Sequence, residues 1–345
     1  MEVALTTQRN DIRLSLPSKG RLAQETMDFL AAAGLHIKKP NPRQLTASIP
    51  ILPSLTVLFQ RPGDIVVSVR DGSVDFGITG WDILQERGGN GAVLPLLPQL
   101  GYGQCSLNVI VPEAHTSLKN MANLVEWSES LKRPLRAATK FPSLASRFFK
   151  QHALADVRLI EAEGALEAAP AIGYADIIVD LVSTGTTLRD NRLRMLDDGQ
   201  VLESETCLIA NRKALRDRPE VLEIGRLLLE FIEGHLRAKG NVSVFANMRG
   251  ESPAAIAARM YTQDVIGGLE GPTISPVVNR LDGNWYAVHI IVRRDKLARA
   301  ISELRAIGGS GVVVTRVDYI FEDQPDAVKA MLAAIGKGDA DAQAL

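Results

Sequence analysis

The chain has 345 residues, of which 46% are hydrophobic and 5% aromatic, and its formal net charge is −1. This near-neutral balance favours neither a nucleic-acid-binding protein nor a protein of the membrane surface. No apolar run approaches the roughly 18 residues that a membrane-spanning helix needs, so we expect no membrane segment.

The length predicts two or three domains. Residues 1–10 are polar and carry no signal-peptide pattern, and we expect them to form a flexible tail. The two cysteines, Cys105 and Cys207, have no metal-type spacing. A reduced, cytoplasmic protein is therefore the simplest interpretation.

Apolar periodicity predicts alternating strands and helices in the first half of the chain. The expected strands lie at 12–16, 75–79, 106–111, 135–139, 157–162 and 175–181, with further short strands within 35–60. Helices are expected at 22–33, 118–131, 143–153 and 165–172. Two shorter helices are also expected: one follows the Pro-Gly break at 62–63 and ends at 69, and the other opens at 80–82 and ends at 88. Such alternation predicts mostly parallel sheets whose faces are covered by helices.

The pattern changes after a strand at 207–210 and a long amphipathic helix at about 219–238. The later expected elements are a strand at 242–246, a helix at 254–261, strands at 273–278 and 285–293 joined by a turn at 282–284, a helix at 297–307 and a strand at 312–321. The order βαββαβ is typical of a ferredoxin-like domain. One more helix and a polar end occupy 326–345.

The segment 177–188 is the most informative one. It reads as a buried strand ending at Asp180, followed by a loop of hydroxyl side chains around Gly185. Gly185 can adopt conformations that aim several backbone N–H groups at a phosphate, and a helix starting near Leu188 would aim its positive end at the same place. Further donors can come from Ser183, Thr184, Thr186 and Thr187. A phosphorylated sugar suits this loop: the loop would hold the phosphate, and Asp180 would bind the sugar hydroxyls or stabilise a developing positive charge. The alternative is a Ser/Thr-rich turn that merely follows a core strand.

Several motifs occur in an order that resembles the long, regulated form of ATP phosphoribosyltransferase, the first enzyme of histidine biosynthesis. The resemblance spans about 12–322, and DLVSTGTTL at 180–188 is its strongest element. Supporting motifs are KGRL at 19–22, DFGITG at 75–80, ATKFP at 138–142, GALE at 164–167, GYAD at 173–176, CLI at 207–209 and LEGPTISP at 269–276.

The resemblance implies an α/β fold of two periplasmic-binding-protein-like lobes with the active site between them, plus a C-terminal ferredoxin-like βαββαβ regulatory domain. The implied limits are 11–104 with 206–238 for lobe I, 105–205 for lobe II with the phosphate loop, 239–325 for the regulatory domain and 326–345 for a last helix and tail. The two crossings between the lobes should lie near 103–107 and 200–208. Since Cys105 and Cys207 fall there, we expect them on neighbouring strands, close but reduced.

The implied reaction joins ATP, through N1 of its adenine, to C1 of phosphoribosyl pyrophosphate, and pyrophosphate leaves. This direct displacement needs no covalent enzyme intermediate. The protein must orient two polyanions and stabilise a positive ribosyl centre. Mg²⁺ is the implied cofactor, because it binds phosphate oxygens through few protein ligands; we assign it no ligand.

The resemblance also assigns residues to roles. The loop Ser183 to Thr187 would hold the 5-phosphate, and Asp180 would face the ribose. Glu167 and Glu163 are further catalytic candidates, although either could simply begin or cap a helix. Candidates for ATP or phosphate contacts are Lys19, Gly20, Arg21, Gly80, Tyr102, Lys140 and Arg147. We interpret Trp81 as a packing residue, and the five histidines match no triad or metal spacing.

Regulation is implied by the last domain. Histidine would bind between neighbouring C-terminal domains of a homo-oligomer that ranges from dimer to hexamer, and AMP or ADP are further candidate effectors. The effector candidates are Asn247, Leu269, Thr273 and Ser275. Asn247 stands where some relatives place an acidic contact, and Glu251 is an alternative to it. Neither a nucleic acid nor a membrane is an expected partner.

Three other classes deserve comparison. A solute-binding protein without catalysis would be expected to carry an export signal and gives no reason for the last domain. An inactive regulatory paralogue conflicts with the intact phosphate loop. A purine phosphoribosyltransferase would place paired acidic residues before its loop, where this chain has Asp180 alone.

Overall fold

A computed structural model of the chain describes residues 11–41, 44–89, 91–162, 164, 166–278 and 284–336, so the expected tail at 1–10 lies outside the described residues. The chain divides into two compact units, Met1–Ala31 with Leu35–Leu227 and Ala327–Leu345, and Ala32–Gly34 with Leu228–Asp326. In the described part of the chain, no helix has the length and apolar character needed to cross a membrane.

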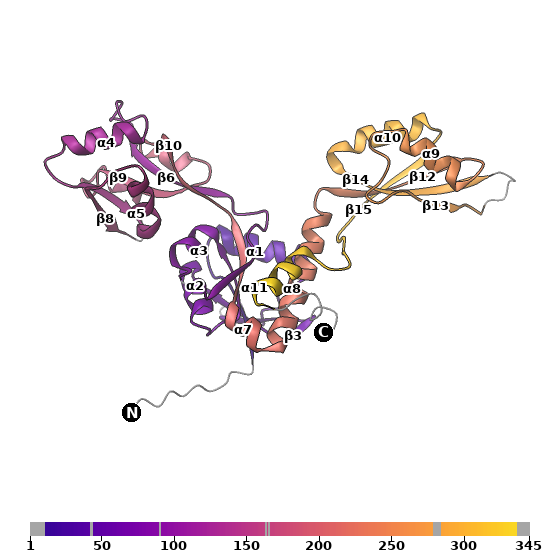
Figure 1. Cartoon of the computed structure of the whole chain (residues 1–345), viewed down its shortest axis with the longest axis horizontal. Coiled ribbons are helices and arrows are strands. Elements are labelled where there is room, and N and C mark those ends of the chain that lie inside the picture. Colours follow the sequence, from indigo (N-terminus) through magenta and orange to yellow (C-terminus); the bar gives the residue numbers. More distant parts are fainter. Residues whose placement is uncertain are drawn as a thin grey trace. The chain divides into compact units, whose positions relative to one another are not determined.

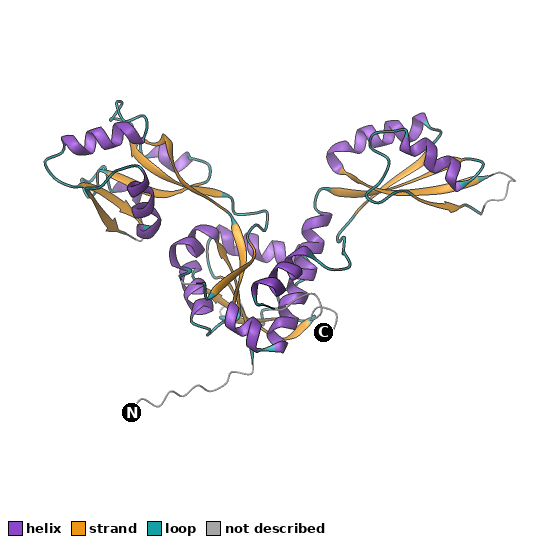
Figure 2. Ribbon diagram, viewed as in Figure 1, coloured by secondary structure: helices purple, strands orange, loops and turns teal. Residues whose placement is uncertain are grey.

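The first unit contains two lobes, each built on one sheet (Figures 1 and 2). The sheet of lobe I has the order β2-β3-β1-β4-β11-β5. Its strands are β1 (Ile12–Pro17), β2 (Thr46–Ile49), β3 (Leu52–Gln60), β4 (Phe76–Gly80), β5 (Val93–Leu97) and β11 (Thr206–Asn211). Its helices are α1 (Arg21–Ala32), α2 (Pro62–Arg70), α3 (Trp81–Arg87), α7 (Arg212–Asp217) and α11 (Asp326–Ala334), and α8 (Pro219–Ala238) runs from this unit into the second.

Lobe II has the strand order β10-β6-β9-β7-β8. Its strands are β6 (Cys105–Pro112), β7 (Leu135–Thr139), β8 (Val157–Glu161), β9 (Ile177–Val182) and β10 (Leu193–Ser204). Its helices are α4 (Met121–Ser130), α5 (Pro142–Gln151), the 3₁₀ turn η1 (Leu166–Ala168) and α6 (Thr186–Asp190). Apolar side chains of α4 and α5, among them Leu124, Phe148 and Phe149, pack on Leu107, Val109 and Val179 of this sheet.

The prediction of mostly parallel sheets is wrong, because both sheets are mixed. β1 pairs in parallel with β3 and β4, and β7 with β8 and β9. The other pairings are antiparallel. The cause is the route of the chain: β6 brings it into lobe II and β10 leads it back, so these neighbours must run in opposite directions, and β11 continues into lobe I between β4 and β5.

Three local predictions also need correction. The expected helix at 165–172 is reduced to η1, since Pro170 lacks an N–H and its ring obstructs a helix interior. The helix expected near Leu188 begins two residues earlier, as α6. The last expected strand, 312–321, is shorter: β15 (Ser310–Arg316) ends where its partner strand begins, with Val242 opposite Arg316.

The second unit carries the βαββαβ order that the sequence predicts. Its elements are β12 (Asn241–Arg249), α9 (Pro253–Tyr261), β13 (Thr273–Pro276), β14 (Trp285–Arg293), the 3₁₀ turn η2 (Arg294–Lys296), α10 (Leu297–Ala306) and β15. The antiparallel sheet has the order β13-β14-β12-β15, and α9 and α10 both cover one of its faces (Figure 2). Val244 and Met248 point into this core, whereas Phe245 and Asn247 lie on the open face.

The acidic residue of the DFGITG motif stabilises lobe I. Asp75 is 1% exposed, and its carboxylate accepts from the backbone N–H of Arg13 at 2.8 Å and from the guanidinium of Arg218 at 3.0 Å. We expect Asp75→Ala to lower the free energy of unfolding by about 3 kcal/mol, because it removes the buried acceptor of the Arg13 N–H and one of the two carboxylates that pair with the Arg218 guanidinium. Urea-induced unfolding of both proteins measures the difference.

Asp71→Ala is the matched control, since Asp71 makes an exposed pair with Arg70 whose loss should cost less than about 1 kcal/mol. Equal effects of the two substitutions would contradict a structural role for Asp75.

Candidate active site

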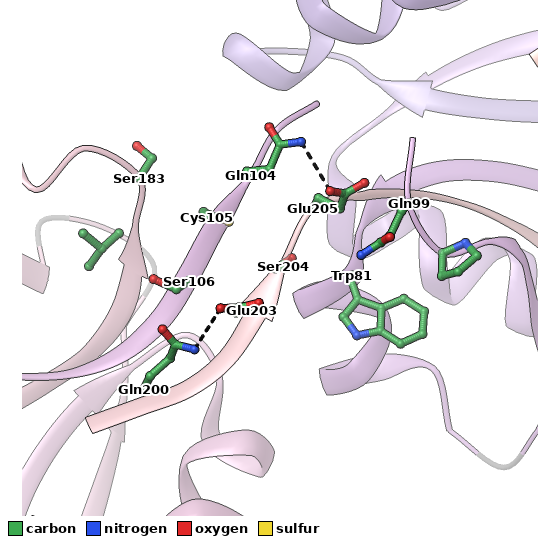
Figure 3. A pocket seen from close by; sticks show the side chains of 12 residues that line it. Trp81, Gln99, Gln104, Cys105, Ser106, Ser183, Gln200, Glu203, Ser204 and Glu205 are labelled. Atoms are coloured by element: carbon green, nitrogen blue, oxygen red, sulfur yellow. Dashed lines mark hydrogen bonds between the residues drawn. The ribbon is translucent and has the colours of Figure 1, made fainter. Parts of the chain in front are cut away.

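Two short segments carry the chain between the lobes. Gln104 leads into β6, and Glu205 lies between Ser204 of β10 and the start of β11. The Glu205 carboxylate joins both segments, because it accepts from the backbone N–H of Gly101 at 2.9 Å and from the Gln104 amide at 3.3 Å (Figure 3). The Glu205 carbonyl accepts from the N–H of Trp81 at 2.8 Å, which attaches the crossing to the start of α3.

A buried carboxylate lies against the same crossing. Asp82, 4% exposed, accepts from the Ser204 hydroxyl at 2.6 Å, and its own N–H donates to Ser204 Oγ at 2.9 Å. Burial raises the pKa of Asp82, and the hydrogen bond from Ser204 opposes that rise. Gly80 leaves space for this carboxylate, since a Cβ there would lie 2.3 Å from Asp82 Oδ1.

A cavity of about 570 Å³ borders the crossing (Figure 3). Among its lining side chains are Trp81, Gln99, Gln104, Ser183, Gln200 and Glu203. The Trp81 ring packs against the lobe I core, as predicted, and also borders this cavity.

A second cavity, of about 320 Å³, brings the first turn of lobe I together with lobe II. Its lining includes Arg21, Glu25, Gly80, Asp82, Leu181 and Ser183. The Arg21 guanidinium contacts Glu25 Oε1 at 3.1 Å, and its side chain is 59% exposed. Within the described residues, Glu25 Oε2 is buried and has no hydrogen-bond partner. This cavity therefore offers an exposed cation to a ligand.

The predicted phosphate loop encloses a third cavity, of about 120 Å³. Its lining includes Glu167, Asp180, Ser183, Thr184, Gly185 and Thr187. Gly185 has φ = +71°, a left-handed conformation that side chains other than that of glycine rarely adopt. The hydroxyls of Thr184 and Thr186 lie 3.2 Å apart within hydrogen-bond distance. Ser183 lines all three cavities, so they meet around this residue.

Asp180 lies within β9 rather than at its end, because pairing with β6 extends the strand to Val182. Its Oδ1 accepts from the N–H of Leu181 at 2.8 Å. Burial raises the pKa of Asp180 and the Glu167 carboxylate adds to the rise, whereas the Leu181 N–H and the Lys140 ammonium oppose it.

Other predicted residues of lobe II lie around this carboxylate or farther away. Glu167 stands on η1 and borders the same cavity as Asp180. Glu163 lies outside the described residues. Lys140, in the turn between β7 and α5, is exposed and close enough to act on Asp180 electrostatically. Arg147 is exposed on α5.

The remaining candidates of lobe I fall into two groups. Lys19 and Gly20 form the exposed turn before α1, where Gly20 has φ = +80°. Tyr102 instead packs on α1: its hydroxyl donates to Thr26 Oγ1 at 3.0 Å, and its ring centroid lies 5.0 Å from that of Phe29. Burial raises the pKa of Tyr102.

Both cysteines are free thiols, Cys105 on β6 and Cys207 on β11. The expectation of neighbouring strands is wrong, because β6 belongs to the lobe II sheet and β11 to the lobe I sheet. Cys105 pairs with Ser204, and Cys207 pairs with Thr79 of β4. Burial raises the pKa of Cys105 to about 11, with a contribution from Asp82, so this thiol stays protonated at neutral pH. The closeness of the two sulfurs stays a prediction.

Three of the effector candidates share the open face of the second unit. Ser275 and Asn247 both pair with Ala287 of the strand between them, so the three residues form one row across the sheet. Thr273 occupies the next row on this face, opposite His289. Leu269 is 61% exposed in the segment before β13.

Sequence reasoning missed the residues that act across the crossing. Neither the apolar periodicity nor a motif marks Ser204, Glu205 or Glu25 in the sequence. Asp82 carried a weak signal, because it follows Gly80 by two residues at the end of the DFGITG motif.

Two mixed sheets, two crossings and a hydroxyl-rich loop beside a carboxylate define a two-lobed α/β protein with a cavity at that loop. Comparison with known proteins identifies the family. The profile described as ATP phosphoribosyltransferase matches residues 61–232, and the one described as HisG, C-terminal domain, matches residues 238–319. The chain belongs to the ATP phosphoribosyltransferase family.

Individual relatives support this assignment. ATP phosphoribosyltransferase 2, chloroplastic, of Arabidopsis thaliana is 44% identical over 95% of this chain and 81% of its own length. ATP phosphoribosyltransferase of Gemmatimonas aurantiaca is 36% identical over 90% of this chain and 99% of its own. Among solved structures, the ATP phosphoribosyl transferase (HisG:HisZ) complex from Thermotoga maritima has a TM-score of 0.50 at 25% identity, covering 64% of this chain and 98% of that one.

The raised pKa of Asp180 makes a prediction about stability. Burial disfavours the charged form of Asp180 in the folded protein but not in the unfolded chain, so at neutral pH Asp180→Asn should raise the melting temperature by about 2–4 °C, the shift that about 1 kcal/mol causes in a domain of this size. As the pH falls through the raised pKa, the folded wild type binds this proton more tightly than the unfolded chain does and gains stability. The difference should therefore vanish near pH 3.8, the ordinary value for this group.

Thermal unfolding at a series of pH values measures this difference, and Asp190→Asn on the exposed surface of α6 controls for the change in net charge. A variant that melts below the wild type at neutral pH would show that Asp180 stabilises the fold.

Proposed function

We propose that the chain transfers the phosphoribosyl group of phosphoribosyl pyrophosphate to N1 of the adenine of ATP, with release of pyrophosphate, as the first step of histidine biosynthesis. One observation carries the proposal beyond family membership. Ser183 borders both the loop cavity and the cavity that Arg21 and Gly80 line, so a ligand held by the loop would lie near groups of the other lobe.

The loop is suited to the 5-phosphate. Gly185, in its left-handed conformation, has no Cβ to obstruct a phosphate that approaches the backbone. Ser183, Thr184 and Thr187 line the same cavity and can add hydroxyl donors. Asp180 shares this cavity, so its carboxylate would lie near the ribose of the bound substrate. There it would accept hydrogen bonds from ribose hydroxyls and stabilise the positive charge that develops at C1.

ATP would occupy the lobe I side of the cleft. The exposed Arg21 guanidinium can hold phosphate oxygens through two parallel hydrogen bonds, and Lys19 on the same turn adds positive charge. Lys140 and Arg147 supply cations from lobe II for the triphosphate or the leaving pyrophosphate.

The residues around the loop fit Mg²⁺. Asp180 and Glu167 border one small cavity and offer the hard oxygen ligands that this ion prefers. Bound there together with the pyrophosphate oxygens, Mg²⁺ would neutralise the charge of the leaving group. Within the described residues, no group of three or more His, Cys, Asp and Glu is arranged to hold a metal.

The second unit would bind histidine and regulate the enzyme. Asn247 and Ser275 flank Ala287 in one row of the open sheet face and offer an amide and a hydroxyl. Effector binding there would bias a homo-oligomer, from dimer to hexamer, toward a less active state by a coupling free energy between two sites.

The free thiols support a reducing compartment such as the cytoplasm.

The direct test mixes the protein with ATP, phosphoribosyl pyrophosphate and Mg²⁺ and follows pyrophosphate and phosphoribosyl-ATP. We expect transfer by the wild type and a fall in kcat/KM of about 100-fold or more for both variants. Asp180→Asn removes the negative charge beside the ribose, and Gly185→Val adds a side chain to the loop that borders the phosphate cavity.

Gly173→Val is the control for backbone strain, because Gly173 has the same φ of +71° at an exposed position outside the cavities. A folded wild type that binds ATP but forms no product would overturn the proposed reaction.

Regulation is tested by adding histidine to this assay. We expect Asn247→Ala to raise the half-inhibitory concentration of histidine about tenfold and to leave the uninhibited rate unchanged, because the lost amide contact affects the effector alone. Thr315→Ala, a small exposed change on β15 of the same sheet, should leave inhibition unaltered. Equal sensitivity of the wild type and Asn247→Ala would remove Asn247 from the effector site.

A further inference from the structure

The first turn of α5 lacks a cap from its own neighbourhood. Phe141 occupies the N-cap position, and its phenyl ring offers no acceptor. Pro142 follows at the first helical position and has no N–H. The N–H groups of Ser143 and Leu144 therefore need an acceptor from elsewhere.

Glu86 of lobe I supplies that acceptor. One carboxylate oxygen accepts from the N–H of Ser143 at 2.8 Å, and the other accepts from the N–H of Leu144 at 2.9 Å. Glu86 lies near the end of α3, 57 residues before Ser143, on the other side of the first crossing. A carboxylate that accepts two N–H groups at a helix N-terminus makes charge-assisted bonds and also interacts favourably with the helix dipole.

This contact fixes the lobes at a point away from the crossing strands. α3 begins at Trp81 and Asp82, which lie against the crossing, whereas Glu86 is one turn farther along. On the lobe II side, the contact holds the helix that carries Arg147 and follows Lys140. The separation of the lobes in turn sets how the Arg21 turn faces Ser183 across their shared cavity.

We propose that Glu86 is a positioning residue: by capping α5 from the opposite lobe, it holds the two halves of the substrate cleft at the separation that binding requires. The inference rests on the proposed function for its consequence in catalysis. Its structural part, the fixed separation of the lobes, stands independently of any substrate. Because Ser143 is exposed, water can replace the carboxylate at its N–H, so removal of Glu86 costs the fold mainly the bond to the N–H of the buried Leu144.

The first experiment measures the separation without substrate. Spin labels on Ser54→Cys in β3 and Lys150→Cys in α5, both exposed positions, report the distance between the lobes. Adding Glu86→Ala should broaden the distance distribution and shift it to longer values. Gln85→Ala, an exposed neighbour on the same helix, is the matched control and should leave the distribution unchanged. An unchanged distribution for Glu86→Ala would overturn the proposal.

The second experiment measures the kinetic consequence. For Glu86→Ala we expect the KM for both substrates to rise about tenfold with kcat within about twofold. Part of the binding free energy must then bring together the two lobes that the cap no longer holds. Glu86→Gln, whose carbonyl oxygen still accepts one N–H, should give an intermediate KM. Wild-type KM values in a Glu86→Ala variant with separated lobes would refute the positioning role.

The two experiments also separate this proposal from the proposed function. If the wild type shows no transfer at all, the proposed function fails, while the interlobe distance still decides whether Glu86 holds the lobes.

Discussion

The arrangement of this protein depends on the two strands that carry the chain between its lobes. β6 enters lobe II and β10 leaves it as its antiparallel neighbour, and β11 then enters the lobe I sheet between β4 and the edge strand β5. The buried pair of Asp82 and Ser204 forms at this place, although desolvation of the carboxylate disfavours its charged form. Such a cost is tolerated where the hydrogen bonds fix a geometry that the site needs.

The charges of the site follow a consistent division. The carboxylates of Asp180 and Asp82 are largely buried, and burial raises the pKa of each, whereas the cations of Arg21 and Lys140 are exposed. Exposed cations can meet two polyanionic substrates without first losing a buried partner. A partly desolvated carboxylate interacts strongly with a positive charge that develops nearby, because the local dielectric is low. The same environment that destabilises ionised Asp180 in the free protein would therefore serve the proposed reaction.

What the sequence could predict was local in origin. The strand at 285–293 and the helix at 219–238 agree with the structure at both ends, because their periodicity is strong and their limits are marked by turn residues. β10 was missed, since Asp197, Asp198 and Gly199 interrupt its pattern and its pairing is shifted in register there. The loop after Asp180 could also be predicted, because its hydroxyl side chains and Gly185 are contiguous in the sequence. The Asp82–Ser204 and Glu86–Ser143 contacts join residues 122 and 57 positions apart, and no local pattern encodes them.

These two contacts have different mechanical roles. Two adjacent strands between rigid lobes leave a hinge, because a few backbone dihedrals at the crossing can absorb a rotation of one lobe against the other. Contacts at the crossing itself, such as those of Glu205 and Ser204, fix where the hinge lies but do little to set its angle. A contact away from the crossing acts with a longer lever and does set the angle. Glu86 makes such a contact, and it reaches the α5 turn that the local sequence leaves without a cap. Because Phe141 offers no acceptor, the first turn of α5 in lobe II depends on lobe I for its cap.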